Sequence, residues 1–379
     1  MTTVGDVESW CDENLPELYD IGMFDLEEIR AEVDDAVDEA LEPFAGILDD
    51  DAIEEMKDAA ASWFRAHHEL LIDMIQLIPT AAIQALCNKP QTAQHSADWY
   101  SQRRNRLTAS EFGQILDSPA KRNALLRQKL SADTGDRVGI LQPIGIAQPD
   151  GEMVATTWGH RFEPITRDIF ELELAGVGTV CDTLGRFTHA TIPWLSASPD
   201  GLITKGPLAG RLVEIKSPKT RQPGDFVPPE YYIQMQIQME VCDLDVVEFI
   251  EAQFAQRPID AFTEKDREDC EAAAWKGRIE VRGHLEDQTS WRYSYSRPVE
   301  DLDDALLSSS DLPLLESSVW WLLKGGWHPR TVFRNHEWWA TVGWPNAELF
   351  WAEVQSLRLN PQEEVEEKKK ENTISWLGS

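Results

Sequence analysis

The sequence predicts an α/β fold in which helices flank a central mixed sheet. Three observations support this prediction. Residues 212–215 form a short apolar, β-branched run, and residues 246–254 form another, as is typical of buried strands. Residues 231–241, between these runs, have the pattern of a helix. A helix that joins two buried strands indicates a layered α/β core.

The chain divides into three predicted regions. We expect residues 1–92 to form an acidic helical region, because apolar residues recur there at helical spacing. We expect residues 93–258 to hold the core, in the order helix, strand, strand, strand, helix, strand. Residues 259–379 are predicted to be helical and rich in tryptophan. These tryptophans either fill a core or an oligomer interface, which we favour, or stack on unpaired bases.

The charge of the chain is distributed unevenly. The formal net charge is −32, and residues 1–58 alone hold 21 Asp or Glu against 2 Arg or Lys. Residues 99–130, in contrast, hold seven Arg or Lys against two acidic residues. Such a basic segment can bind phosphate locally although the whole protein is acidic. The acidic N-terminal region is either a solvated surface or an arm that competes for the basic groove.

Composition also constrains the compartment and excludes some cofactors. No apolar run approaches the roughly 18–20 residues of a membrane span, and the acidic N-terminus lacks the basic start of a signal peptide. We therefore expect an intracellular protein, cytoplasmic or in a eukaryotic host nuclear, that is not secreted. The five cysteines are scattered without a Cys-x-x-Cys, which argues against a disulfide framework, a zinc site and an iron–sulfur cluster.

The strongest chemical signal is the order Asp200, Glu214, Lys216. Two carboxylates can hold hard divalent cations through oxygen. Lys216 follows Glu214 by two positions, so both side chains lie on one face of a strand. This pattern is the outline of a PD-(D/E)xK nuclease. The alternative is an ordinary Asp-Gly turn beside a buried Glu–Lys ion pair.

Three further segments supply candidate site residues. Glu163 lies near the start of an amphipathic helix. It is either a further acid of the nuclease site or an acid that stabilises the helix start by its interaction with the helix dipole. Tyr231 and Gln234 share a helix face at i,i+3, either toward a reacting phosphate or as a polar edge. Arg103 and Ser110 lie in an arginine-rich segment that begins a helix, which indicates an anion site or a solvated, capped helix start.

In this order the motifs resemble a known family. The set Arg-rich/Leu-Thr-Ala-Ser, Trp-Gly-x-x-x-Glu-Pro, Ser-Pro-Asp-Gly-Leu, Glu-Ile-Lys and Tyr-x-x-Gln-x-Gln is similar to that of the YqaJ-type viral recombinase (phage lambda exonuclease) family. The resemblance covers about residues 95–255. It implies a restriction-endonuclease-like core, extended here by helical N- and C-terminal regions.

The resemblance also implies roles for these residues. It implies two Mg²⁺ ions, replaceable by Mn²⁺, and assigns four ligands, namely Glu163, Asp200, Glu214 and the backbone carbonyl of Ile215. It implies that Lys216 activates or positions the attacking water and that Gln234 helps to orient it. Tyr231 is implied to lie nearby and to contact the substrate. It implies that Arg103 and Ser110 bind the 5′-phosphate of a DNA end. One departure is Ala190, which stands by simple counting where the phage enzyme has a further acid.

The activity implied is digestion of the 5′-ended strand of linear duplex DNA, in recombination, repair or genome processing. The implied partners are double-stranded DNA ends and a single-strand annealing protein, and the implied assembly is a trimer. Two alternatives stay open from the residues alone. One is a structure-specific endonuclease on the same core, and the other is a catalytically silent binding module.

Overall fold

The computed structural model describes residues 80–94, 96–131, 153–174, 179–205, 208–224 and 226–359, with a few positions between 37 and 59. Most of the predicted acidic helical region therefore lies outside the described residues. Its described part includes α4 (Thr80–Cys87). The charged C-terminal end also lies outside them. None of the described helices is long and apolar enough to span a bilayer.

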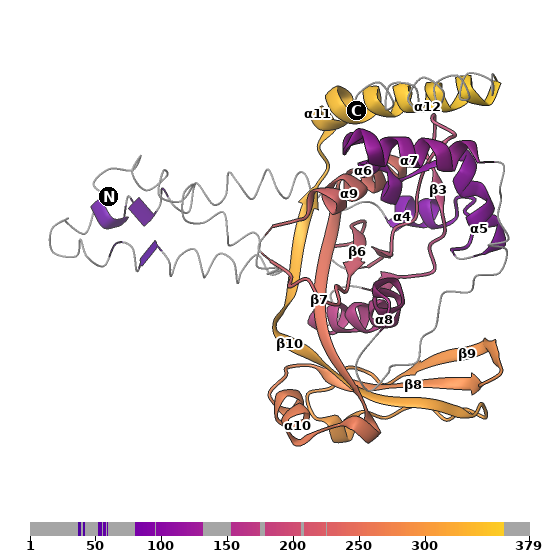
Figure 1. The fold of residues 1–379 in the computed structure, drawn as a ribbon. Coiled ribbons are helices and arrows are strands. Elements are labelled where there is room, and N and C mark those ends of the chain that lie inside the picture. Colours follow the sequence, from indigo (N-terminus) through magenta and orange to yellow (C-terminus); the bar gives the residue numbers. More distant parts are fainter. Residues whose placement is uncertain are drawn as a thin grey trace, which may run out of the picture.

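A seven-stranded mixed sheet organises the fold, as predicted (Figure 1). Its strand order is β2-β5-β6-β7-β10-β8-β9. In that order the strands are Val180–Cys181, Gly201–Ile203, Leu212–Lys216, Val246–Pro258, Leu314–Phe333, Lys276–His284 and Asp287–Tyr295. Strands β6 and β7 pair in parallel, and helix α9 (Pro229–Cys242) connects them along the chain. All other pairs of neighbouring strands in this sheet are antiparallel.

A small second sheet lies beside the first. It consists of β1 (Leu107–Thr108), β4 (Leu195–Ala197) and β3 (Phe187–Thr188), in that spatial order. Helices α5 (Ala97–Gln102) and α6 (Ala109–Leu116) flank β1 along the chain, and α7 (Pro119–Leu130) follows them. This second sheet matters for function because it brings the arginine-rich segment to the turn that precedes β5.

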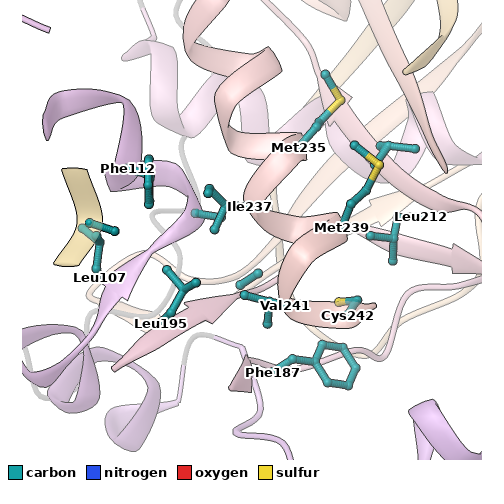
Figure 2. Close-up of a cluster of buried hydrophobic side chains, with 14 of the residues drawn as sticks. Leu107, Phe112, Phe187, Leu195, Leu212, Met235, Ile237, Met239, Val241 and Cys242 are labelled. Atoms are coloured by element: carbon teal, nitrogen blue, oxygen red, sulfur yellow. The ribbon is translucent and has the colours of Figure 1, made fainter. Parts of the chain in front are cut away.

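Helices cover both faces of β6 (Figure 1). On one face, Val213 and Ile215 pack with the long helix α8 (Ala155–Glu173). On the other face, Leu212 packs with α9, as the period of two along a strand requires. Figure 2 shows side chains of α9 among those of α6, the small sheet and β6, including Met235, Ile237, Met239, Phe112, Leu195, Phe187 and Leu212.

The C-terminal region is only partly helical. Helices α11 (His336–Trp338) and α12 (Trp344–Leu359) match the expectation, joined by a π-helical turn at Trp339–Gly343. The expectation is wrong for residues 276–333, which form β8, β9 and β10, with α10 (Glu264–Glu271) before them. The aromatic and β-branched residues of this segment suit a half-buried pleated surface, and β10 pairs along the whole of β7. The pairing partner is distant in sequence, so local pattern did not reveal it.

The described tryptophans of this region mainly build the core. Trp320, Trp321 and Trp351 are 0%, 3% and 4% exposed, respectively. Trp194 stacks on Trp351 with ring centroids 5.2 Å apart, which fixes α12 over the small sheet. For Trp320, Trp321 and Trp351 the burial agrees with the core interpretation and not with stacking on unpaired bases, whereas Trp327, Trp338, Trp339 and Trp344 are half-buried.

Candidate active site

Glu214 lies at the centre of the site, fully buried on the face of β6 that meets α9. Its Oε1 accepts hydrogen bonds from the Lys216 ammonium and, at 2.5 Å, from Gln234 Nε2. Its Oε2 accepts a hydrogen bond from Gln238 Nε2 at 2.5 Å. Gln234 and Gln238 are one helical turn apart on α9, so both amides reach the same carboxylate. The buried acid therefore has polar partners at both oxygens.

Asp200 approaches Glu214 from the turn that precedes β5. Its Oδ2 accepts the backbone N–H of Ile215 at 2.9 Å. Gly201 follows it at a crowded place, because a Cβ atom there would lie 2.5 Å from Val180 Cγ1 and 3.3 Å from Val213 Cβ. The Asp-Gly pair thus has a packing cause, since only glycine lets β5 lie between its neighbours at this point.

A cavity of about 150 Å³ joins residues from distant parts of the chain. Of the predicted site residues, it is lined by Arg103, Ser110, Glu163, Asp200 and Gln234. Glu163 enters from α8 with 32% of its side chain exposed, and His160 Nδ1 lies 3.9 Å from its carboxylate. The structure thus brings the predicted anion residues and the predicted acids to one cavity.

The remaining predicted residues lie directly behind this cavity. Glu214, Ile215 and Lys216 follow one another on β6 and contact the cavity residues through Gln234 and Asp200. The Lys216 ammonium lies 5.2 Å from the centroid of the Tyr231 ring. Tyr231 therefore lies beside the lysine, on the helix face it shares with Gln234.

The acids of the site repel one another. Burial raises the pKa of Asp200 well above its ordinary value, and the carboxylates of Glu214 and Glu163 raise it further. Burial works against the charge of Lys216, but Glu214 and Asp200 outweigh it and raise the pKa of that ammonium. Burial likewise opposes ionisation of Glu163, but His160 and then Lys216 lower its pKa overall. Lys216 is therefore a fixed cation among carboxylates whose charge is only partly compensated.

Two arginines, Arg103 and Arg186, also line the cavity. Arg103 Nη2 lies 3.2 Å from Glu111 Oε1, and the guanidinium of Arg103 lies 5.3 Å from the centroid of the Trp99 ring. Glu111 is also bonded to the buried Lys129 at 2.7 Å and completes the capping box of Thr108 at the start of α6. The arginine segment is therefore both a capped helix start and one wall of the cavity.

Sequence reasoning missed several residues of this cavity and its support. They are Gln94, Trp99, Thr108, Ala109, His160, Arg186 and Ser198, which line it, and Gln238, which holds Glu214. Gln238 had a signal, since a second amide four positions after Gln234 falls on the same helix face. Arg186 had none, because only the β-bridge between Thr92 and Arg186 brings it to the cavity.

The donors present fit a hard divalent cation in type. Two carboxylates, Glu214 and Glu163, lie close enough to raise the pKa of Asp200, and a bound cation would relieve that repulsion. Among the residues that the structure describes, however, no three His, Cys, Asp or Glu side chains are arranged as a ready-made metal cluster. The bonds from Lys216, Gln234 and Gln238 to Glu214 give one reason, because they occupy its oxygens. Ala190 adds no ligand.

The fold and the site together define a class. A mixed sheet with Asp200 before one strand and Glu214 and Lys216 on the next is the arrangement of the PD-(D/E)xK nuclease superfamily. Residues 98–245 match the model of the YqaJ-like viral recombinase domain.

Other comparisons give more distant likenesses. An uncharacterized protein of Acanthamoeba polyphaga mimivirus is 26% identical over 176 residues, which is 43% of this chain and 29% of that protein. The chain thus matches less than a third of the length of this relative. The alkaline exonuclease LHK-Exo of Laribacter hongkongensis is 18% identical with a TM-score of 0.42, covering 71% of this chain and 98% of its own. A phage-related exonuclease of Haemophilus somnus 129PT is 12% identical with a TM-score of 0.37, covering 69% and 96%.

Proposed function

We propose that the chain is a metal-dependent deoxyribonuclease that degrades the 5′-ended strand of linear duplex DNA. One observation carries the proposal. A single cavity is lined both by Arg103 and by the acids Glu163 and Asp200. Such a cavity suits a nucleotide whose terminal phosphate meets the arginine while its next phosphodiester meets the acids. The match of residues 98–245 to a viral recombinase domain supports DNA as the substrate.

Four oxygen donors would hold the metal, namely the carboxylates of Glu163, Asp200 and Glu214 and the carbonyl of Ile215. Mg²⁺ suits these hard donors, and Mn²⁺ can replace it. When bound, such an ion supplies an activated water and stabilises charge on the phosphate oxygens. Asp200 is the donor whose ionisation the site most opposes, so it gains most from the cation.

The other residues of the site hold charge and position. Lys216 stays protonated beside Glu214, so its role is to neutralise phosphate charge and orient a water, not to accept a proton. Gln234 lines the cavity and donates to Glu214, which places its amide between the acid and the substrate. Tyr231 keeps its ring against the lysine and limits the directions in which the ammonium can move.

The anion-binding residues of the cavity support the polarity of digestion that the family resemblance implies. Arg103 and Ser110 line it, and both can donate to a terminal phosphate oxygen. An enzyme that grips the terminal phosphate and cuts the next bond releases one nucleotide at a time. A trimer and a single-strand annealing partner, both implied by the family resemblance, stay predictions that sedimentation and co-purification can test.

The test is digestion of linear duplex DNA labelled on one strand. Substrates carry 5′-phosphate or 5′-hydroxyl ends and are compared with a closed circle, in Mg²⁺, in Mn²⁺ and in EDTA. We expect progressive loss of the 5′-phosphorylated strand with the divalent ions only and no cut in the circle. Asp200→Asn and Lys216→Ala are expected to remove the activity.

Each other result would change the proposal. A cut circle would show a structure-specific endonuclease on the same core. Loss from the 3′ end would reverse the polarity. No cleavage with either ion, by protein that still binds DNA ends, would show a catalytically silent binding module.

A further inference from the structure

We propose that Arg186 is a specificity-determining residue that makes the cavity select a terminal phosphate monoester over an internal phosphodiester or a hydroxyl end. The inference rests on the proposed function, because it names the group that the anion side of the same cavity recognises. It concerns a residue with no recognisable motif around it.

Arg186 is held rigidly. It precedes β3, and its backbone N–H and C=O pair with Thr92 at 2.7 and 3.3 Å. The residue is 2% exposed, and its guanidinium lies over the Trp99 ring, 4.4 Å from the ring centroid. Nη1 donates to the carbonyl of Trp99 at 2.6 Å. The side chain therefore has a fixed position in the wall of the cavity.

The rest of this guanidinium has no partner within the described residues. Its Nε and Nη2 atoms are buried and make no hydrogen bond there. Leaving such donors unpaired in the interior is costly, and more so when the group is charged. Because the side chain lines a cavity, a bound ligand that offers acceptor oxygens can satisfy them.

The charge around Arg186 is also uncompensated. Lys129 and Arg103 form ion pairs with Glu111, and no carboxylate forms one with Arg186 among the described residues. Three buried or half-buried cations therefore share one carboxylate. Burial and the nearby Arg103 lower the pKa of Arg186 to about 10, which still leaves it charged at neutral pH.

This surplus of positive charge selects the ligand. A phosphate monoester carries about −1.5 to −2 charges at pH 7, because its second pKa is near 6, whereas a phosphodiester carries one. A terminal monoester also has three free oxygens, which suit two guanidinium groups and the hydroxyl of Ser110. A hydroxyl end offers neither, so Arg186 would stay uncompensated when such an end is bound.

The first test measures anion binding without catalysis. Inorganic phosphate is added in EDTA, and the melting temperature is followed for the wild type, Arg186→Gln and Arg106→Gln. Arg106 is a matched control, because it lies nearby, donates to Thr188 and Pro193 and is not among the cavity-lining residues. We expect phosphate to raise the melting temperature of the wild type and of Arg106→Gln, and not of Arg186→Gln. Equal shifts in all three would overturn the proposal.

The second test measures the ratio of kcat/KM for 5′-phosphate and 5′-hydroxyl ends. Arg186→Gln should lower this ratio roughly 10- to 100-fold, the range expected for hydrogen bonds to a charged group. In the wild type the ratio should also rise between about pH 5 and pH 7, as the monoester loses its second proton. The variant should lose this rise.

The design separates the two proposals. If the wild type cleaves neither end, the proposed nuclease function fails, and the phosphate-dependent melting temperature still decides the role of Arg186. If the wild type cleaves both ends equally, the inference fails alone. If Arg186→Gln does not fold, Arg186→Lys replaces it in both tests, because lysine keeps the positive charge but cannot donate the paired hydrogen bonds of a guanidinium group. The ratio of kcat/KM for 5′-phosphate and 5′-hydroxyl ends should be several-fold lower in Arg186→Lys than in the wild type. An unchanged ratio would overturn the proposal.

Discussion

The indole N–H of Trp99 donates to the hydroxyl of Ser198 at 3.1 Å, across 99 positions of sequence. The guanidinium groups of Arg103 and Arg186 both lie over the Trp99 ring, whereas Ser198 is two residues before Asp200. Gln94 strengthens this connection, because its Nε2 donates to the carbonyl of Pro199 at 3.0 Å. Contacts thus connect Arg103 and Arg186 with the segment that precedes Asp200, which limits how far these residues can move relative to one another.

The repulsion among the site acids predicts how Asp200→Asn affects the melting temperature. Because the folded-state pKa of Asp200 is raised, the metal-free protein loses stability as the pH rises from the ordinary value near 3.8 to the folded value. In EDTA at neutral pH, Asp200→Asn should therefore melt higher than the wild type. Mg²⁺ at 100 times its Kd should stabilise the wild type by about 2.7 kcal/mol and the variant much less. A variant that melts lower in EDTA and responds equally to Mg²⁺ would contradict the proposed ligand role.

Gln238 should matter for activity although it is not among the cavity-lining residues. Its amide holds Oε2 of Glu214, and groups that orient a metal ligand typically contribute about 10- to 100-fold in activity or metal affinity. We expect Gln238→Ala to lose that much in Mg²⁺-dependent cleavage. Gln236→Ala is the control, because Gln236 lies on the same helix and bonds the carbonyl of Phe333 instead. Equal activity of the two variants would show that Glu214 does not need Gln238.

The buried ion pair between Glu111 and Lys129 should contribute strongly to the free energy of unfolding. Glu111→Gln leaves Lys129 without its carboxylate at 0% exposure, and such a loss costs about 3–5 kcal/mol of unfolding free energy. Urea denaturation at pH 7 measures it. Asp117→Asn, which breaks the exposed pair with Lys121, is expected to leave the midpoint almost unchanged.

The same pair predicts a pH dependence. Burial raises the pKa of Glu111, but Lys129 and Arg103 outweigh it and lower the pKa below the ordinary 4.5. Burial lowers the pKa of Lys129 despite the bond, yet that group starts from 10.5, so Glu111 governs the acid side. The stabilisation is therefore present above about pH 4.5 and is lost as the pH falls through the folded-state pKa of Glu111. Glu111→Gln should flatten the wild-type decline in stability below pH 5, and an unchanged decline would contradict this account.

Trp320 tests the role of the C-terminal tryptophans. Its side chain is 0% exposed and packs edge-on against Phe254, with ring centroids 5.6 Å apart. Trp320→Ala should cost about 3–5 kcal/mol in urea denaturation, as large core truncations do. Leu349→Ala, at 67% exposure, should change stability by less than about 0.5 kcal/mol. A stable Trp320→Ala with weakened binding of single-stranded DNA would instead support base stacking.

The sequence by itself determined the local chemistry of the site. Alternation along a strand places Glu214 and Lys216 on one face, and the helical repeat places Tyr231 and Gln234 together. These relations depend only on the period of an element, so a short segment contains them. The strands around 212–215 and 246–254 and the helix α9 followed in the same way.

Only the tertiary structure decided which distant segments meet. Arg186 reaches the cavity through a bridge to Thr92, and Trp99 meets Ser198 through a side-chain bond. The strands at 276–333 were predicted as helix, because their preference for β structure is realised only by pairing, of β10 with β7, of β8 with β10 and of β9 with β8. Pairing between strands and closure of a cavity depend on contacts between residues far apart in the chain, and a local pattern of side chains does not encode which partner will be there.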